Sequence, residues 1–155
     1  MEDWKQDRID SAVRGENPTV LFKMKSGFAV ISDSQFLPGN CILLGYPRTG
    51  CLNDLSLEKR VDFLVDMSLI GDAISAVCQP LCINYDILGN YDPFLHAHII
   101  PRYTWEEERL RKGPVWRYPV ENWNHEDMQF NEIEHGVLKR RLSETLQKLV
   151  EGREV

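Results

Sequence analysis

The fold of this chain is decided by the stretch Asn84-Tyr-Asp-Ile-Leu-Gly-Asn-Tyr-Asp-Pro-Phe-Leu-His-Ala-His-Ile-Ile-Pro-Arg-Tyr103. Its second half is rich in residues that favour β-strands. Side chains on a strand alternate between its two faces, so Phe94, His96 and His98 are expected to point the same way. The apolar residues between them would then pack on a core. The sequence therefore predicts two imidazoles side by side on one face of a sheet.

Two neighbouring histidines, with the residues around them, indicate a site for phosphate chemistry. A histidine side chain exchanges protons near neutral pH, and its neutral ring is a nucleophile. Just upstream, Gly89 and Asn90 predict a tight turn with accessible backbone N–H groups. Arg102 adds a positive charge after the strand. A His-x-His pair alone is commonly surface decoration or an incidental metal ligand, so the interpretation depends on this context.

The segment from Phe94 to Ile100 resembles the active-site signature of the histidine-triad (HIT) nucleotide hydrolases and transferases, His-φ-His-φ-His-φ-φ, where φ is apolar. Phe94 replaces the first histidine, and the second and third are present. The surrounding Gly-Asn-x-x-Pro-x-Leu-His-x-His-Ile-Ile-Pro-Arg-Tyr is similar to the diadenosine polyphosphate hydrolase-like branch. A weaker likeness runs from Gly27 to Arg48, where Asn40 stands at a position that is commonly histidine. The resemblance spans roughly residues 20 to 120.

The resemblance and the residue pattern together predict one HIT-like α+β domain over residues 1–155, with 104–155 as a C-terminal extension and helix. We expect an antiparallel sheet of about five strands, one long helix and a C-terminal helix. Strands are expected at 20–25, 28–32, 41–46, 81–85 and 95–100, and helices at 3–14, at 57–77 and after the cap Asn131. The apolar stripe of the long helix is expected to comprise Leu57, Val61, Leu64, Val65, Ile70, Ile74 and Val77. That of the last helix would comprise Ile133, Val137, Leu138, Leu142, Leu146 and Leu149.

The resemblance implies catalytic roles for His96, His98 and Asn90. His96 matches the family's middle histidine, which attacks the α-phosphorus and forms a nucleotidyl-histidine that water hydrolyses. The family orients this ring through a backbone carbonyl at its other nitrogen. His98 would donate a hydrogen bond to phosphate or leaving-group oxygens, and its charge would offset the charge that develops there. Asn90 would hold a phosphate oxygen or position the attacking group.

Further residues are matched to substrate binding. Asp33 is the candidate for the ribose hydroxyls, since a carboxylate accepts two hydrogen bonds from a diol, and Ser32 competes for this role. The other candidates are Asn84 for phosphate or ribose, Gly89 through its backbone, and Arg102 for distal phosphates. For Asp33, Asn84 and Asn90 the simpler alternative is a side chain that stabilises a turn. For Arg102 it is a solvated cation at the end of a strand.

Length and composition set limits that do not depend on the family. A chain of 155 residues, with 43% hydrophobic and 27% charged residues, is typical of a single globular domain. No apolar run is long enough to cross a bilayer, and the charged N-terminus lacks the core of a signal peptide. A net charge of -6 argues against a general nucleic-acid binder. We therefore expect a cytoplasmic protein without nucleic-acid or membrane partners.

The four cysteines raise a metal alternative. Without an export signal, Cys41, Cys51, Cys78 and Cys82 are expected to be reduced thiols. The three-residue spacing between Cys78 and Cys82 differs from the C-x-x-C of structural zinc sites. The sequence therefore predicts no metal site. A zinc-dependent nucleotidyltransferase remains a third and weaker alternative.

The predicted function is cleavage of a phosphoanhydride or phosphoramidate at the α-phosphate of a nucleoside or dinucleoside substrate. The resemblance implies a homodimer whose sheets join edge to edge. No protein-held cofactor is required, although a divalent cation on the substrate phosphates is compatible with the reaction. Because Phe94 removes one supporting histidine, the alternative is a catalytically weak nucleotide-binding or regulatory protein. The segment 104–128, which contains three tryptophans, could be a folded extension, a lid or a dimer contact.

Overall fold

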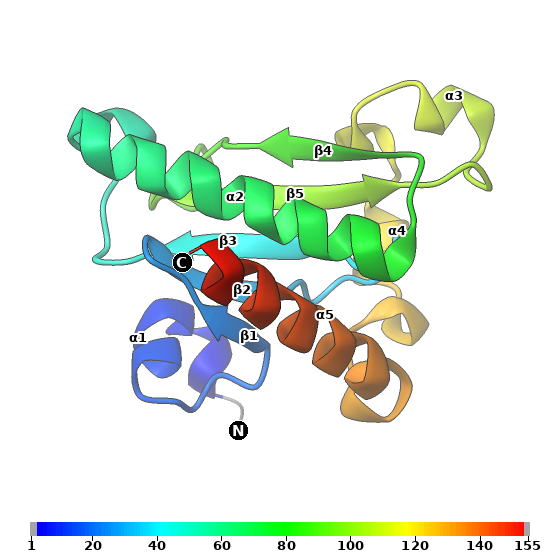
Figure 1. Ribbon diagram of the computed structural model, residues 1–155. Coiled ribbons are helices and arrows are strands. Elements are labelled where there is room, and N and C mark those ends of the chain that lie inside the picture. The colour runs from blue at the N-terminus through cyan, green and yellow to red at the C-terminus, as the bar shows by residue number, and fades with distance from the viewer. Residues whose placement is uncertain (1–2, 154–155) are drawn as a thin grey trace.

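A five-stranded antiparallel sheet forms the centre of the computed structural model, which describes residues 3–153 (Figure 1). The strands are β1 Val20–Lys23, β2 Gly27–Ile31, β3 Cys41–Gly45, β4 Cys82–Asp86 and β5 His96–Arg102, in the order β1-β2-β3-β5-β4. Each strand pairs antiparallel with its neighbours. This architecture confirms the predicted α+β class, and the ends of the strands lie within two residues of the predicted ones.

The long helix and the C-terminal helix are also confirmed. The helices are α1 Arg8–Val13, α2 Leu57–Cys78, α3 Glu108–Arg111, α4 Val120–Asn124 and α5 Glu132–Arg153, with 3-10 turns at η1 Asp3–Lys5, η2 Leu52–Asp54, η3 Val115–Arg117 and η4 Glu126–Met128. The expected helix at 3–14 is therefore divided into η1 and α1. The side chain of Ser56 caps α2 and that of Asn131 caps α5, each by accepting a backbone N–H. Between residues 3 and 153, no helix has the length and apolar character needed to span a bilayer.

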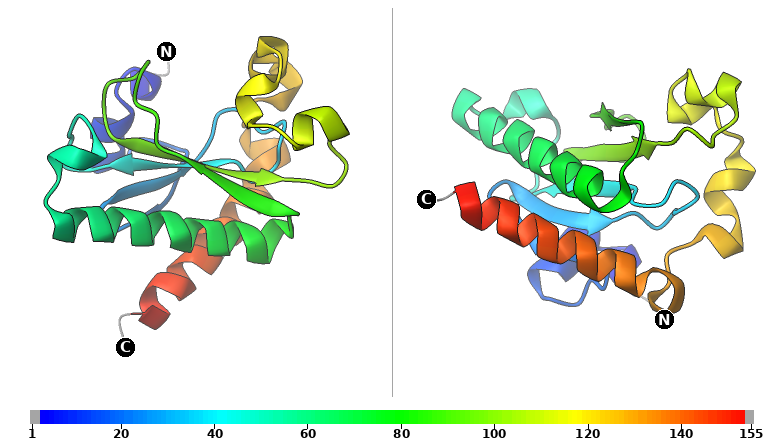
Figure 2. Two further views of the ribbon diagram at one scale, coloured as in Figure 1. Left: turned by 90° about the horizontal axis from the view of Figure 1, so that it is seen from above. Right: turned by 45° about the vertical axis from the view of Figure 1, so that its right-hand side comes forward.

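The two long helices cover one face of the sheet. Figures 1 and 2 show α2 and α5 lying across the same side. The main core lies between these helices and the sheet, and includes Leu43, Phe63, Ile74, Ile99 and Leu146. The opposite face has α1 at one end and the segment from α3 to η4 at the other (Figure 2). This second face is the one toward which His96 and His98 point.

The predicted apolar stripe of α2 is wrong in its first half. Leu57, Val61 and Leu64 are 72%, 51% and 47% exposed. The helix instead buries Phe63, Met67, Ile70 and Ile74, which follow one another at helical spacing. Both sides of the first turns carry apolar residues, so the pattern there did not determine which side faces the sheet. A row of apolar side chains consequently remains exposed on α2.

The predicted stripe of α5 is also wrong at its start. Ile133 is 97% exposed and Val137 is 60% exposed, whereas Leu142 and Leu146 are buried. The later turns of α5 pack against α2 and β1. Ser143 fixes this packing by donating a hydrogen bond from its hydroxyl to the carbonyl of Leu21, 2.6 Å away. The first turns therefore project past the sheet that the rest of the helix covers.

Candidate active site

The two histidines of β5 line a cavity of about 190 Å³ on the face opposite α2 and α5. Strand pairing determines this arrangement, because His96 lies opposite Leu44 and His98 opposite Ile42 in β3. The cavity is lined by Arg8, Val30, Ile31, Ser32, Asp33, Ile42, Leu44, Asp92, Phe94, His96 and His98. Alternation along the strand placed Phe94, His96 and His98 on one face, as the sequence predicted.

His96 is held in one orientation by the backbone. Its side chain is buried, and its Nδ1 lies 2.8 Å from the carbonyl oxygen of Phe94. A carbonyl only accepts hydrogen bonds, so Nδ1 must carry the proton. In the neutral ring the lone pair is then on Nε2, for which the structure of residues 3–153 shows no hydrogen bond. The orientation implied by the resemblance is present, and Nε2 is available as a nucleophile.

His98 is uncharged at neutral pH in this environment. Burial, together with the neighbouring His96, lowers the pKa of His98 to about 4, and the carboxylates of Asp86 and Asp92 only partly oppose this. The ring centroids of His96 and His98 are 5.1 Å apart, and the rings are nearly perpendicular. The expectation that His98 contributes a positive charge is therefore corrected for the free protein. His98 can still donate one N–H bond to a phosphate oxygen.

The segment 104–128 contributes an aromatic wall beside His98. The Trp116 ring meets the His98 ring edge to face at 5.1 Å, and its other neighbour is Trp123, stacked at 5.2 Å. The indole N–H of Trp116 donates to Asp86 in β4 over 3.0 Å. These contacts join the segment to the last two strands of the sheet. The segment is therefore folded, and it packs against the site.

Asp33 and Ser32 both line the cavity, as expected for candidates at the ribose end. The Asp33 carboxylate accepts two hydrogen bonds from the guanidinium of Arg8, over 3.0 and 2.5 Å. Arg8 belongs to α1 and was not identified from the sequence. Since it lies 25 residues before Asp33, no local pattern indicates the contact. A ribose diol would have to share or displace this guanidinium.

Arg102 and Asn84 lie outside the cavity that the two histidines line. Arg102 is only 1% exposed, and its guanidinium donates to Glu106, Asn84 and the carbonyls of Leu110 and Gly113. These acceptors use all five of its N–H groups. Arg102 therefore has no donor left for a distal phosphate. Its role is to fix the start of the segment 104–128 on the end of β5.

Gly89 and Asn90 lie in the loop between β4 and β5, outside the cavity. Gly89 has a φ of +70°, which favours glycine, and Asn90 is exposed. The structure therefore does not bring the Asn90 amide next to His96. Asp92, in the same loop, lines the cavity. Its carbonyl accepts the backbone N–H of Phe94 over 2.8 Å, and this contact fixes the loop just before β5.

No metal-binding cluster supports the zinc alternative. Within residues 3–153, no three or more side chains of His, Cys, Asp or Glu are grouped so that they could hold a metal ion. Cys82 is exposed in β4, whereas Cys78 is half-buried at the end of α2. Burial raises the pKa of the Cys78 thiol. The cysteines therefore behave as separate thiols.

Comparison with known proteins supports a distant relationship to nucleotide hydrolases. No protein-family model matches the sequence. Over 91 residues the chain is 32% identical to the bis(5'-adenosyl)-triphosphatase of Saccharomyces cerevisiae. The match covers 54% of this chain and 44% of the yeast protein, so the chain spans less than half the length of the curated relatives it matches.

Solved structures identify the class of fold. A histidine triad protein from Marinobacter aquaeolei superposes with a TM-score of 0.66 and 22% identity, over 84% of this chain and 89% of that one. A hypothetical histidine triad nucleotide-binding protein from Sulfolobus tokodaii superposes with a TM-score of 0.69 and 11% identity, over 92% of this chain and 93% of that one. The diadenosine triphosphate hydrolase of Plasmodium falciparum superposes with a TM-score of 0.57 and 18% identity, over 83% of this chain and 78% of that one. The chain has the fold of the histidine-triad proteins. Within that class it is similar in sequence to the yeast triphosphatase.

Proposed function

We propose that this protein is a HIT-family hydrolase that cleaves nucleoside polyphosphates or phosphoramidates at the α-phosphate. The observation that carries the proposal is the contact of the His96 Nδ1 with the Phe94 carbonyl, because it leaves Nε2 as the nucleophilic nitrogen at the cavity. Similarity to the yeast triphosphatase supports a dinucleoside polyphosphate such as diadenosine tri- or tetraphosphate as the substrate.

The reaction we propose has two displacements at phosphorus. The Nε2 lone pair of His96 forms a bond to the α-phosphorus, and the bond to the leaving oxygen or nitrogen breaks with its electron pair. The ring is then a cationic nucleotidyl-imidazole, with its Nδ1 proton still on the Phe94 carbonyl. A leaving nitrogen takes up a proton from solvent as it departs. Water then attacks the same phosphorus and releases one proton to solvent, the P–N bond breaks, and the nucleoside monophosphate leaves as Nε2 regains its lone pair.

The neighbouring groups would support these steps without a positively charged His98. One N–H of His98 donates to a phosphate oxygen, and the contact of its ring with Trp116 holds the imidazole in place for that hydrogen bond. Asp33 and Ser32 would bind the ribose at the other side of the cavity. Each step uses side chains and water, so we propose that no protein-held cofactor is needed. A divalent cation would enter only with the substrate phosphates.

Turnover of two substrates by purified protein tests this proposal. We expect the wild type to hydrolyse diadenosine tetraphosphate or an adenosine phosphoramidate, and His96→Ala to lose at least a thousandfold in kcat. His125→Ala is the matched control, because His125 is exposed in the segment 104–128 and should leave kcat unchanged. Trapping of a labelled nucleotide on wild-type protein, absent in His96→Ala, would identify the intermediate. Equal turnover by both proteins would refute the role of His96.

The second candidate is a nucleotide-binding protein with little catalysis. Two features favour it: in our alignment Phe94 takes the place of the first signature histidine, and the Arg8 guanidinium occupies both carboxylate oxygens of Asp33. Such a protein would bind AMP and leave both substrates intact. Calorimetric titration of AMP into wild-type protein, alongside the turnover assay, separates the two candidates.

We also propose a homodimer joined through β4. This strand is the last of the sheet, so one row of its backbone groups faces away from any partner strand. Tyr85 in β4, with Val61 and Leu64 in the adjacent α2, adds exposed apolar surface. Light scattering would detect the dimer, and the double substitution Val61→Glu and Leu64→Glu, which places charges on the exposed apolar surface, would convert it to monomers. A monomer in the wild type would refute this proposal.

A further inference from the structure

We propose that a basic cavity beside Phe94 is an anion site, which binds the phosphates of the leaving group beyond the phosphorus attacked by His96. We call it the Arg48 site. This inference rests on the proposed function and narrows its substrate class to molecules with a negatively charged leaving group.

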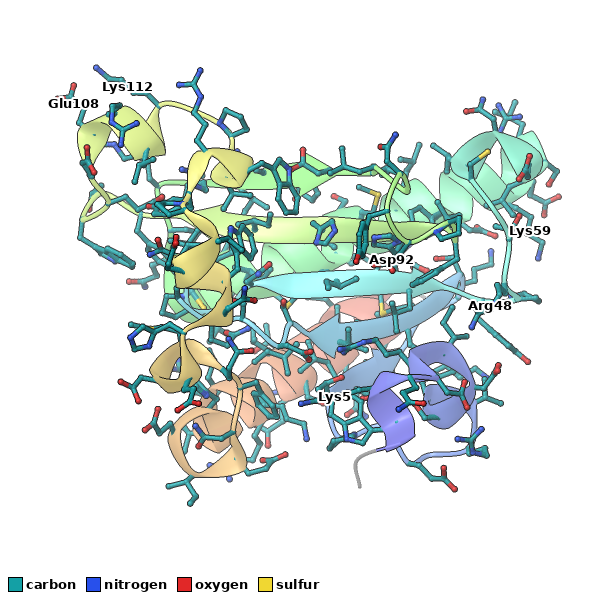
Figure 3. The ribbon with its side chains drawn as sticks, turned by 180° about the vertical axis from the view of Figure 1, so that it is seen from behind. Lys5, Arg48, Lys59, Asp92, Glu108 and Lys112 are labelled. Atoms are coloured by element: carbon teal, nitrogen blue, oxygen red, sulfur yellow. The ribbon has the colours of Figure 1, made fainter. Side chains whose placement is uncertain are left out.

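The Arg48 site adjoins the histidine cavity. It has a volume of about 150 Å³ and is lined by Lys5, Gln6, Arg8, Ile9, Arg48, Asp92 and Phe94. Arg8, Asp92 and Phe94 line both cavities, so the two share a wall. Figure 3 shows Arg48 at the edge of the sheet, Asp92 over its face and Lys5 on the N-terminal segment below them. A phosphate chain that leaves His96 along this wall reaches the basic side chains directly.

Arg48 is placed against Phe94 by the backbone of the loop that carries it. The N–H of Leu95 donates to the Thr49 carbonyl over 2.8 Å, and the Gly45 N–H donates to the Leu95 carbonyl over 3.0 Å. The Arg48 guanidinium lies over the Phe94 ring, 5.4 Å from its centroid. The same ring contacts the His96 ring at 4.8 Å. The Phe94 ring therefore contacts both the Arg48 guanidinium and the ring of the proposed nucleophile, His96.

The Arg48 side chain retains free hydrogen-bond donors. It is exposed, and among residues 3–153 no ion pair joins it to a carboxylate. By contrast, Arg8 is paired with Asp33, and Arg102 has every donor occupied. A guanidinium presents a planar pair of N–H groups that matches the geometry of phosphate oxygens. Arg48 therefore has the charge, the position and the unused donors that a phosphate requires.

The local charge favours an anion although the whole chain has a net charge of -6. The two adjoining cavities are lined by the cationic side chains of Lys5, Arg8 and Arg48 and by the carboxylates of Asp92 and Asp33. Arg8 is already paired with Asp33, so Arg48 is the cation whose guanidinium can pair with a phosphate. Asp92 would repel a bare anion, but it can also bind a divalent cation carried on the phosphate chain. The site is suited to a phosphate chain and offers little to a neutral amine.

The replacement of the first signature histidine has a physical role in this arrangement. A phenyl ring attracts a guanidinium through its negative face, and it has no protonated form that would repel Arg48. An imidazole at position 94 would become cationic in mildly acidic conditions. Phe94 therefore supports Arg48 beside the site while it packs against His96.

The proposal predicts a change in leaving-group preference. Arg48→Ala should lower kcat/KM for diadenosine tetraphosphate at least 10-fold and leave that for adenosine phosphoramidate within twofold, since only the first has charge beyond the α-phosphate. Arg48→Lys, which keeps the positive charge, should retain part of the wild-type kcat/KM for diadenosine tetraphosphate. Lys112→Ala is the matched control: Lys112 pairs with Glu108 at the opposite end of the molecule and should change neither value (Figure 3). Equal losses on both substrates would overturn the proposal.

A second experiment does not depend on catalysis. Isothermal titration with tripolyphosphate should show binding to the wild type that weakens at least 10-fold in Arg48→Ala and not in Lys112→Ala. If the wild type hydrolyses neither substrate yet shows this pattern, the proposed function fails and the anion site stands. Arg48 also lines a neighbouring cavity of about 290 Å³ with Lys25 and Lys59. A loss in Lys59→Ala as large as that in Arg48→Ala would place the anion there and refute the site beside Phe94.

Discussion

The Nδ1 of His96 lies 2.8 Å from the carbonyl oxygen of Phe94, two residues earlier in the chain. This contact fixes the neutral ring as the Nδ1–H tautomer, with the lone pair on Nε2. We predict that long-range ¹⁵N–¹H NMR at pH 7.5 will show a protonated Nδ1 and an unprotonated Nε2 for His96. The opposite tautomer would mean that His96 cannot attack phosphorus in this orientation. Assignment by comparison with His96→Gln identifies the signal.

His98 should titrate far below an ordinary histidine. Burial is the main cause of its low pKa, which lies at about 4, and His96 adds to it. Trp116 covers the ring, so Trp116→Ala should let water reach it and raise the pKa toward 6.5. NMR titration of the ring carbon signals from pH 3.5 to 8 measures both values. A wild-type midpoint above 6 would show that His98 is not shielded.

The same shift predicts a specific pH dependence of stability. Because the folded pKa of His98 is depressed, the unfolded chain binds more protons between pH 4 and 6.5, and stability falls as the pH falls through this window. The contribution is about 3 kcal/mol between pH 7.5 and pH 4. Urea unfolding at both pH values should therefore show a smaller loss for His98→Gln than for the wild type. Equal losses of unfolding free energy in the two proteins would contradict the low pKa of His98.

The alternation of side chains along an extended segment is a local rule. It was sufficient to place Phe94, just before β5, on the same face as His96 and His98. Strand pairing with β3 then made that face a site. The phase of α2 was not predictable because Phe63 and Leu64 are adjacent apolar residues on different sides of the helix. Only packing on the sheet decides that Phe63 is buried.

Contacts between distant segments account for what the sequence did not reveal. Arg8 reaches Asp33 from another element, and Arg48 meets Phe94 across a loop. Arg102 is the opposite case. It stands at the end of β5, where the sequence predicted a phosphate-binding arginine, and the segment that follows encloses its side chain. Charge and spacing alone do not show whether the donors of an arginine are already occupied.

The buried pair of Arg102 and Glu106 should be essential for stability. Both side chains are at most 1% exposed. Burial acts to raise the pKa of Glu106, but bonds from Arg102, Tyr118 and the Tyr103 N–H outweigh it and hold that pKa below its usual range. Arg102→Met would leave the carboxylate without its cation and should cost about 3–5 kcal/mol in urea unfolding. Arg109→Ala, which removes an exposed pair with Glu107, is the control and should cost little. A loss in Arg102→Met no larger than in the control would contradict this role.

Substitution of Asp33 can distinguish between two roles of this residue, binding of the ribose and formation of a structural ion pair with Arg8. If its carboxylate accepts the ribose hydroxyls, Asp33→Asn should weaken AMP binding about 10-fold, the equivalent of one charged hydrogen bond, and should not affect 2',3'-dideoxy-AMP. If its only role is to hold Arg8, both nucleotides should lose affinity equally, because the pair positions α1 without contacting the sugar. Ser32→Ala tests the competing residue on the same wall. Calorimetry with the two nucleotides and three proteins decides among these cases, since only direct contact with the diol makes the effect of a substitution depend on the sugar.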